Sequence, residues 1–164
     1  MARIPATSIS LRIAKLTFAV TLLGTFGAHC GSDTPSEYKQ LFNQPLPQQE
    51  EKFKQFPLDK QVDVYIYAMY VEPPLKRYAR YLGSSGKEVL PFLVRRLEAE
   101  KSDTTKAHLI YALAEIHQHY YSLRDEKQTL ESVTRVISNI SDDYRKKQCQ
   151  DYLEIITETP GFDG

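Results

Sequence analysis

Apolar residues recur every three or four positions from Leu58 onward, and this spacing constrains the fold more than any other feature of the sequence. An α-helix turns once every 3.6 residues, so residues at this spacing lie along one side of it and can face a common core. We therefore expect an all-α fold in which successive helices pack as antiparallel hairpins. The expected core stripes are Val62, Tyr65, Ile66 and Met69; Leu75, Tyr78, Ala79 and Leu82; Val89, Leu90, Leu93 and Leu97; Leu109, Ala112, Leu113 and Ile116; Leu130, Val133, Ile137 and Ile140; and Tyr144, Cys149, Tyr152, Leu153 and Ile156.

The residues around each stripe predict where the helices begin and end. Ser or Thr followed three residues later by Glu forms a capping box, and a single Asp or Ser can cap a helix start. Gly just after a helix commonly adopts a left-handed conformation that ends it. The expected signals are the capping boxes Thr34–Glu37 and Ser85–Glu88, with Pro35 as the first helical residue, start signals at Asp103, at Asp125 with Gln128, and at Ser141 or Asp142, and a left-handed cap at Gly83.

Proline placement predicts two short helices before these stripes. The first should end at Phe42, because the segment Asn43–Pro47 contains two prolines, and the second should run from Glu50 to Phe56. One alternative to an all-helical chain stays open at Val62–Tyr67, where β-branched and aromatic residues would also suit a strand.

Residues 86–116, GKEVLPFLVRRLEAEKSDTTKAHLIYALAEI, resemble a HEAT repeat, which is a pair of antiparallel helices. The resemblance rests on Pro91 early in the first helix, leucines on its core face, an Asp at the turn, and small and apolar residues in the second helix. Asp125–Glu158 has the same helix-turn-helix length, and residues 60–82 are a candidate shortened unit. The resemblance implies a short right-handed stack of helical hairpins, of the HEAT or armadillo kind, with a surface that binds another protein. It implies no catalytic activity.

The first 29 residues have the composition of a bacterial export signal. Arg3, Arg12 and Lys15 make the leader basic, and it contains no acidic residue. The apolar run Leu16–Gly27 has twelve residues, whereas a bilayer span needs about 20. This length matches the apolar core of a signal peptide, and the lack of an adjacent Arg pair favours the general secretion route. A buried first helix is the alternative.

Two processing routes fit the segment Gly27–Asp33. It resembles a bacterial lipobox, in which a small residue precedes a Cys that is acylated and begins the mature protein; here that residue is Cys30. His29 departs from this pattern, because Gly, Ala or Ser usually precedes the Cys. The lipobox route predicts a lipid-anchored protein of the bacterial cell envelope that faces the periplasm or the cell surface. The alternative is ordinary cleavage after Cys30, with Ala28 as the other small residue, which releases a soluble secreted protein.

Charge and composition narrow the function classes of the remaining chain. Beyond residue 29 it carries 18 basic and 21 acidic side chains, a net charge of −3 with neutral His, which disfavours general nucleic-acid binding. No cofactor is expected, because the sequence has no Gly-rich phosphate loop. The expected organisation is a signal peptide (1–29), a tether (30–34), short helices (35–56), a helical-repeat domain (57–160) and a tail (161–164).

Tyrosine and basic residues interleave between positions 65 and 81 and form the best local candidate for a binding patch, for contact with a glycan or a peptide. Tyr combines an apolar ring with a polar hydroxyl, which suits both a core and an interface. The alternative is that Tyr65 and Tyr78 belong to the core and the basic residues are only solvated. The residues assigned to the patch are Tyr70, Lys76, Arg77, Arg80 and Tyr81.

His108, His117 and His119 raise the question of a metal site. His117 and His119 lie about 200° apart around a helix, too far to bind one ion together. Glu115 with His119 is the one compatible pair, and two ligands do not make a site, so no metal is expected. Cys149 falls on the apolar side of its helix and is expected to be a packed, unreactive thiol.

These features favour a non-enzymatic exported module of the bacterial envelope whose partner is another envelope protein. No catalytic residue is assigned, and the sequence does not predict an oligomeric state. Two alternatives stay open. One is an enzyme that acts on envelope polymers, which would need His108, His117 or Glu115 to converge in a cleft. The other is an inhibitor or immunity-type protein.

Overall fold

The computed structural model describes residues 34–162, and this part of the chain is all helical. It contains eight α-helices and one 3-10 helix, and no strand. The all-α prediction is confirmed, and the strand alternative at Val62–Tyr67 is wrong. The elements are α1 (Ser36–Phe42), α2 (Leu46–Lys54), α3 (Leu58–Met69), α4 (Arg77–Gly83), the 3-10 helix η1 (Gly86–Val89), α5 (Leu90–Ala99), α6 (Asp103–His119), α7 (Lys127–Ser138) and α8 (Asp143–Glu158).

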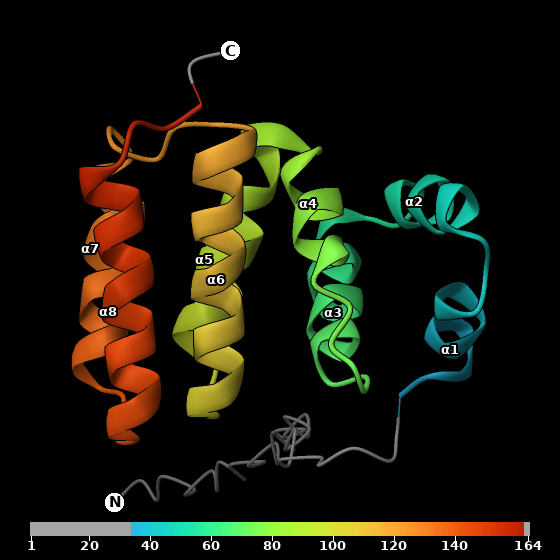
Figure 1. Ribbon diagram of the computed structural model, residues 1–164, viewed down its shortest axis with the longest axis horizontal. Helices are drawn as coiled ribbons and strands as arrows, with labels where there is room; N and C mark the ends of the chain where they lie inside the picture. The colour runs from blue at the N-terminus through green and yellow to red at the C-terminus, as the bar shows by residue number, and fades with distance from the viewer. Residues whose placement is uncertain (1–33, 163–164) are drawn as a thin grey trace, which may run out of the picture.

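The six helices from α3 onward form two layers. One layer contains α3, α5 and α7, and the other contains α4, α6 and α8, in which α6 packs between its two neighbours (Figure 1). Each of α3, α5 and α7 also packs against the helix that follows it in the chain. The short helices α1 and α2 cover the end of the layers at α3 and α4. The two faces of the molecule are therefore built by alternate helices.

The predicted core stripes account for most of the buried apolar residues. In α3, Val62, Tyr65, Ile66 and Met69 are all buried, and the stripes of α5 and α6 are buried throughout. Burying a large apolar side chain contributes roughly 1.5–3 kcal/mol each, so these stripes supply the main free energy of packing. Helical periodicity in the sequence thus located the core correctly.

Tyr144 is wrongly placed by the predicted stripe of α8. Its side chain is 71% exposed, whereas Cys149 and Ile156 on the same helix are fully buried. Five residues separate Tyr144 from Cys149, which places the two side chains about 140° apart around the helix. Tyr144 therefore belongs to the outer side of α8.

The N-terminal helices begin differently from the prediction. Pro35 precedes α1 rather than opening it, and no side-chain hydrogen bond caps the helix, so the expected capping box at Thr34–Glu37 does not form. Helix α2 begins at Leu46, four residues earlier than expected. Pro47 is its second residue, where a helix has no partner for a backbone N–H and proline is tolerated.

Several predicted caps are displaced by tertiary hydrogen bonds. The Ser85 hydroxyl donates to Gln61 Oε1 over 3.0 Å instead of capping the next helix. Ser102, not Asp103, caps α6 by accepting the N–H of Thr105. Helix α7 begins at Lys127 with no side-chain cap, so the signal at Asp125 with Gln128 is also wrong. The predicted cap at Asp142 is confirmed, because its carboxylate accepts the Arg145 N–H at 2.8 Å.

The displaced residue Asp103 joins the start of α6 to the turn between α7 and α8. Its carboxylate accepts the backbone N–H groups of Ser141 and Asp142, the Ser141 hydroxyl and the Lys106 ammonium. These hydrogen bonds favour the charged carboxylate and hold the pKa of Asp103 below its usual range.

Gly83 is the last residue of α4, and its φ is not positive, so the predicted left-handed cap is wrong. Gly is required there for a different reason, because a Cβ would lie 2.3 Å from the ring of Tyr120. The left-handed glycine is Gly86, with a φ of 64°.

The predicted signal peptide, the tether as far as residue 33, the acylated Cys30 and the last two residues lie outside the described residues. Within residues 34–162, none of the helices combines the length and the apolar character that crossing a membrane requires.

Candidate functional site

The structure divides the predicted binding patch between the two sides of α4. Lys76 immediately precedes the helix and is one turn from Arg80, so both lie toward α6. Arg77 and Tyr81 are each one residue further along, which rotates them by about 100° toward α2. The five predicted residues therefore do not form one surface.

Arg77 and Tyr81 belong to the packing of the N-terminal helices. Arg77 donates from Nε and Nη2 to the side-chain oxygen of Gln49, at 3.2 and 2.9 Å. The Tyr81 ring packs against Phe53, 5.8 Å between centroids, and against Tyr78. These two residues hold α4 against α2, and Tyr78 is fully buried, as is Tyr65. The part of the alternative that assigned Tyr65 and Tyr78 to the core is confirmed, whereas the part in which the basic residues are only solvated is wrong for Arg77.

Lys76 and Arg80 lie beside a polar stripe on the outer side of α6. The Lys76 ammonium lies 5.8 Å from the centroid of the Tyr111 ring, a cation–π contact. Arg80 pairs with the Glu115 carboxylate at 3.5 Å, and the Tyr111 hydroxyl donates to the same carboxylate at 3.0 Å. The two cations of α4 are thus joined to α6 through Tyr111 and Glu115.

Tyr70 reaches the same stripe from the end of α3. Its hydroxyl hydrogen-bonds the Thr105 hydroxyl at 2.7 Å, and its ring meets His108 edge to face, with centroids 5.4 Å apart. Tyr70 is still 42% exposed, so one side of its ring is open to solvent.

Helix α8 completes this surface with residues that the sequence analysis did not assign to a site. The Tyr152 ring lies 5.5 Å from Tyr111, and its hydroxyl accepts a hydrogen bond from Gln148. Arg145 donates to Gln148 at 2.9 Å and lies near His108, whose pKa it helps to lower. We call the assembled surface the tyrosine face; it consists of Tyr70, Lys76, Arg80, His108, Tyr111, Glu115, Arg145 and Tyr152.

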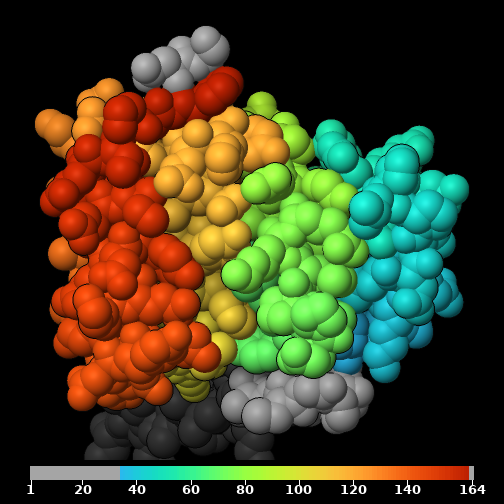
Figure 2. Space-filling model, viewed as in Figure 1, coloured from blue at the N-terminus to red at the C-terminus, as the bar shows by residue number. Residues whose placement is uncertain are grey.

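The tyrosine face lies on the side of the molecule seen in Figure 2. There α6 is visible as a narrow band between the atoms of α8 and those of α4 and the segment before it. His108, Tyr111 and Glu115 recur at i, i+3 and i+7, about 120° around the helix from the centre of the apolar stripe of α6. This polar stripe was the available sequence signal for the face.

Positive charge predominates on the tyrosine face at neutral pH. Burial, with the nearby charge of Arg145, lowers the pKa of His108 to about 4, so its imidazole is neutral. Burial and the hydrogen bond to Glu115 raise the pKa of Tyr111, so its phenol keeps its proton. The charges are then the three cations Lys76, Arg80 and Arg145, and the single carboxylate of Glu115.

The three histidines occupy unrelated environments. His117 is fully buried, and its Nδ1 accepts the Leu123 N–H at 3.1 Å, while its Nε2 lies 3.3 Å from the Thr159 carbonyl. His119 is exposed and lies 3.9 Å from Glu115. His108 is seven residues from Glu115, about 10 Å along the helix. His108, His117 and Glu115 therefore do not converge in a cleft, and residues 34–162 contain no group of three or more His, Cys, Asp or Glu side chains able to hold a metal ion.

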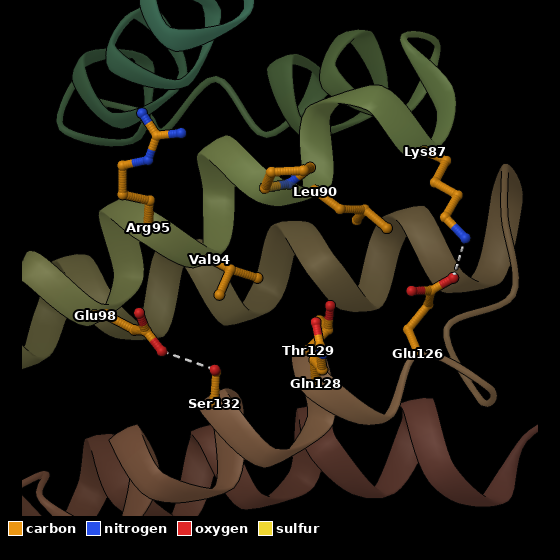
Figure 3. A pocket seen from close by; sticks show the side chains of 10 residues that line it. Lys87, Leu90, Val94, Arg95, Glu98, Glu126, Gln128, Thr129 and Ser132 are labelled. Carbon is orange, nitrogen blue, oxygen red and sulfur yellow. Dashed lines mark hydrogen bonds and ion pairs between the residues drawn. The ribbon is translucent and has the colours of Figure 1, made fainter.

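A concave surface lies on the other layer, between α5 and α7 (Figure 3). This α5–α7 groove encloses about 510 Å³, and Leu90 and Val94 form part of its apolar wall. Three of its four charged groups have partners within the groove, and the fourth, Arg95, contacts the ring of Phe92. Lys87 pairs with Glu126 at 2.6 Å at one end, and Glu98 accepts the Ser132 hydroxyl at 2.7 Å near the other. The groove therefore presents apolar surface and few charged groups that lack a partner.

Cys149 is fully buried, as predicted, and burial raises the pKa of its thiol to about 12. At neutral pH the group is a protonated thiol without access to solvent, so it is a packing residue.

Comparison with known proteins finds no match to this chain among family models, curated proteins or solved structures. The resemblance of residues 86–116 to a HEAT repeat stays a prediction.

Proposed function

We propose that this chain is a non-enzymatic protein-binding module of the bacterial envelope, built as a HEAT-like stack of helical hairpins. The observation that carries the proposal is the tyrosine face. Partly exposed aromatic rings and cations from three helices adjoin there on one surface. Tyrosine and arginine are enriched at protein interfaces, because they combine a large contact area with hydrogen-bonding groups.

The order of the helices supports this role. Alternate helices supply one layer, so α4, α6 and α8 build most of the face, Tyr70 joins it from the end of α3, and a packed core carries it. Repeat-like stacks commonly bind partners through such extended faces, which are rigid before the partner arrives. The α5–α7 groove is a further apolar surface that a partner could cover.

A position-specific crosslinking experiment tests the proposal. A photo-reactive amino acid is placed at Tyr144, which is exposed beside Arg145, in the full chain produced in its own cells. The control position is Glu131, an exposed residue of α7 in the other layer. We expect one defined protein adduct from position 144 and none from position 131. Equal adducts at both positions, or none at either, would contradict the proposal.

The proposed location depends on Cys30, which we propose carries a lipid that anchors the chain to a membrane. A Cys30→Ala change should abolish acylation, lower the mass by the lipid and shift the protein out of the detergent phase. Ordinary cleavage after Cys30 predicts instead that the wild-type protein carries no lipid mass.

A further inference from the structure

We propose that the tyrosine face binds an extended acidic segment of the partner protein. The inference rests on the proposed function and adds the chemistry of the partner. Its basis is the excess of cations among open aromatic rings on the face.

In the part of the chain that the structure describes, two of the three cations have no acidic partner. Among residues 34–162, neither Lys76 nor Arg145 forms an ion pair; Lys76 contacts the ring of Tyr111, and Arg145 contacts Gln148 and the ring of Tyr144. A cation over an aromatic ring still directs N–H donors away from the ring, so a carboxylate can approach it. These two side chains are therefore placed to receive acidic groups.

The third cation is only weakly held. Arg80 pairs with Glu115 at 3.5 Å and its side chain is 62% exposed. Glu115 also accepts the Tyr111 hydroxyl, so one carboxylate serves two donors. A surface ion pair of this kind contributes little to stability, so an incoming carboxylate can share Arg80 without a large loss.

The cations follow the line of α6 from its two sides, with Arg145 on the α8 side and Lys76 and Arg80 on the α4 side. Arg145 lies near His108, Lys76 lies over Tyr111, and Arg80 contacts Glu115. Three and then four helical residues separate these positions, which gives steps of about 4.5 and 6 Å. An extended peptide rises about 3.3 Å per residue, so three to four residues span the line, and alternate side chains fall on the same side.

The aromatic rings of the tyrosine face suit apolar side chains that alternate with acidic residues in the partner segment. Tyr70 with His108 and Tyr111 with Tyr152 form two ring pairs along the same line, with centroids about 5.5 Å apart or less. Ring pairs of this kind offer apolar contact together with hydroxyl groups, which can also bind a peptide backbone. The face thus matches a short segment in which acidic and apolar residues alternate.

The overall charge argues against a long polyanion as the occupant. Beyond residue 29 the chain carries three more acidic than basic side chains, so the chain as a whole does not share the excess of cations found on the face. A polymer with charge along its whole length would meet repulsion outside this surface, whereas a short acidic segment would not.

The test uses the full chain in detergent and fluorescent heptapeptides with alternating Glu and Leu. The control peptide has Gln in place of Glu, and a tetramer of a uronic acid replaces the peptide in a third arm. We expect the Glu peptide to bind in an anisotropy assay, the Gln peptide to bind at least tenfold more weakly, and the saccharide not to bind. Equal binding of the two peptides, or binding of the saccharide alone, would overturn the inference.

A matched pair of double variants tests whether the Glu peptide binds at the tyrosine face. Lys76→Met with Arg145→Met removes the two unpaired cations and keeps their apolar stems. Lys39→Met with Lys127→Met removes two exposed cations from α1 and α7. The first pair should weaken the Glu peptide at least tenfold, and the second should leave it within twofold, with unchanged helicity in both. Equal affinity of the two double variants would refute the assignment.

The crosslinking experiment separates the inference from the proposed function. A position-144 adduct that forms in wild type and persists at full yield in Lys76→Met with Arg145→Met would refute the acidic segment and leave the binding module intact. Absence of both the adduct and peptide binding would refute both.

Discussion

Gln49 holds three of the helices together, and replacing it tests how the N-terminal pair is attached. Its side chain is 2% exposed and sits at the centre of five hydrogen bonds. The amide nitrogen donates to the carbonyl oxygens of Phe42 and Gln44, and the amide oxygen accepts from Arg77 and from the Tyr78 hydroxyl. One buried amide therefore joins α1, α2 and α4.

The magnitude of a Gln49→Leu change follows from these partners. The buried Tyr78 hydroxyl would lose its acceptor, at about 1–3 kcal/mol, and the two carbonyls would cost about 1 kcal/mol each. Arg77 is only half-buried and can turn to water, so its loss is small. Burying the new leucine offsets about 2 kcal/mol. We expect a net fall of about 1–3 kcal/mol in the free energy of unfolding.

Urea unfolding followed by circular dichroism at 222 nm measures this change. The control is Gln48→Leu at the exposed neighbouring position, which should change stability by less than about 0.5 kcal/mol. A fall in the denaturant dependence for Gln49→Leu would show that α1 and α2 detach before the rest. Stabilities of the two variants that agree within about 0.5 kcal/mol would refute the reasoning.

Three further predictions concern buried groups. Burial keeps the pKa of His108 near 4 and lowers that of His117, so the stability that their neutral forms give is complete above pH 6.5 and falls as the pH drops. Urea unfolding at pH 7 and 5 should show a loss of about 2 kcal/mol from His108, and this part should be absent in His108→Gln. Gly83→Ala should destabilise by about 1–3 kcal/mol in the same assay, because its Cβ meets the Tyr120 ring. Cys149 should react with a thiol reagent only at the rate of unfolding, and reaction within seconds in the native state would contradict its burial.

The sequence was most informative where burial alone decides the structure. Apolar residues at helical spacing located α3 to α7 and their inner sides, because a helix packed on one side must repeat this pattern. It was least informative at the helix ends. Ser85 and Asp103 both have capping chemistry, yet Ser85 uses its side chain for a contact with α3 and Asp103 for contacts with the turn between α7 and α8. Such competition depends on the tertiary structure and leaves no local mark.

The candidate site, like the fold, could be predicted from the sequence only in part. Tyr70, Lys76 and Arg80 were predicted from their neighbourhood in the sequence, and they do lie on one face. Arg77 could not be separated from them, because its partner Gln49 is 28 residues away. Tyr152 was assigned to the core because it falls on the predicted stripe of α8. Its contact with Tyr111 joins two separate helices and could not be read from the local sequence. A surface assembled from alternate helices can be recognised only once the layers are known.

The central claim is that distant helices bring their aromatic residues together on one face, and proton NMR of the full chain in detergent tests it most directly. With ring-labelled tyrosine, and with Tyr111→Phe and Tyr152→Phe used to assign the signals, the account predicts a nuclear Overhauser contact between these two rings, whose centroids are 5.5 Å apart. Well-resolved signals from both rings with no contact between them would contradict the packing of α6 against α8, and with it the tyrosine face.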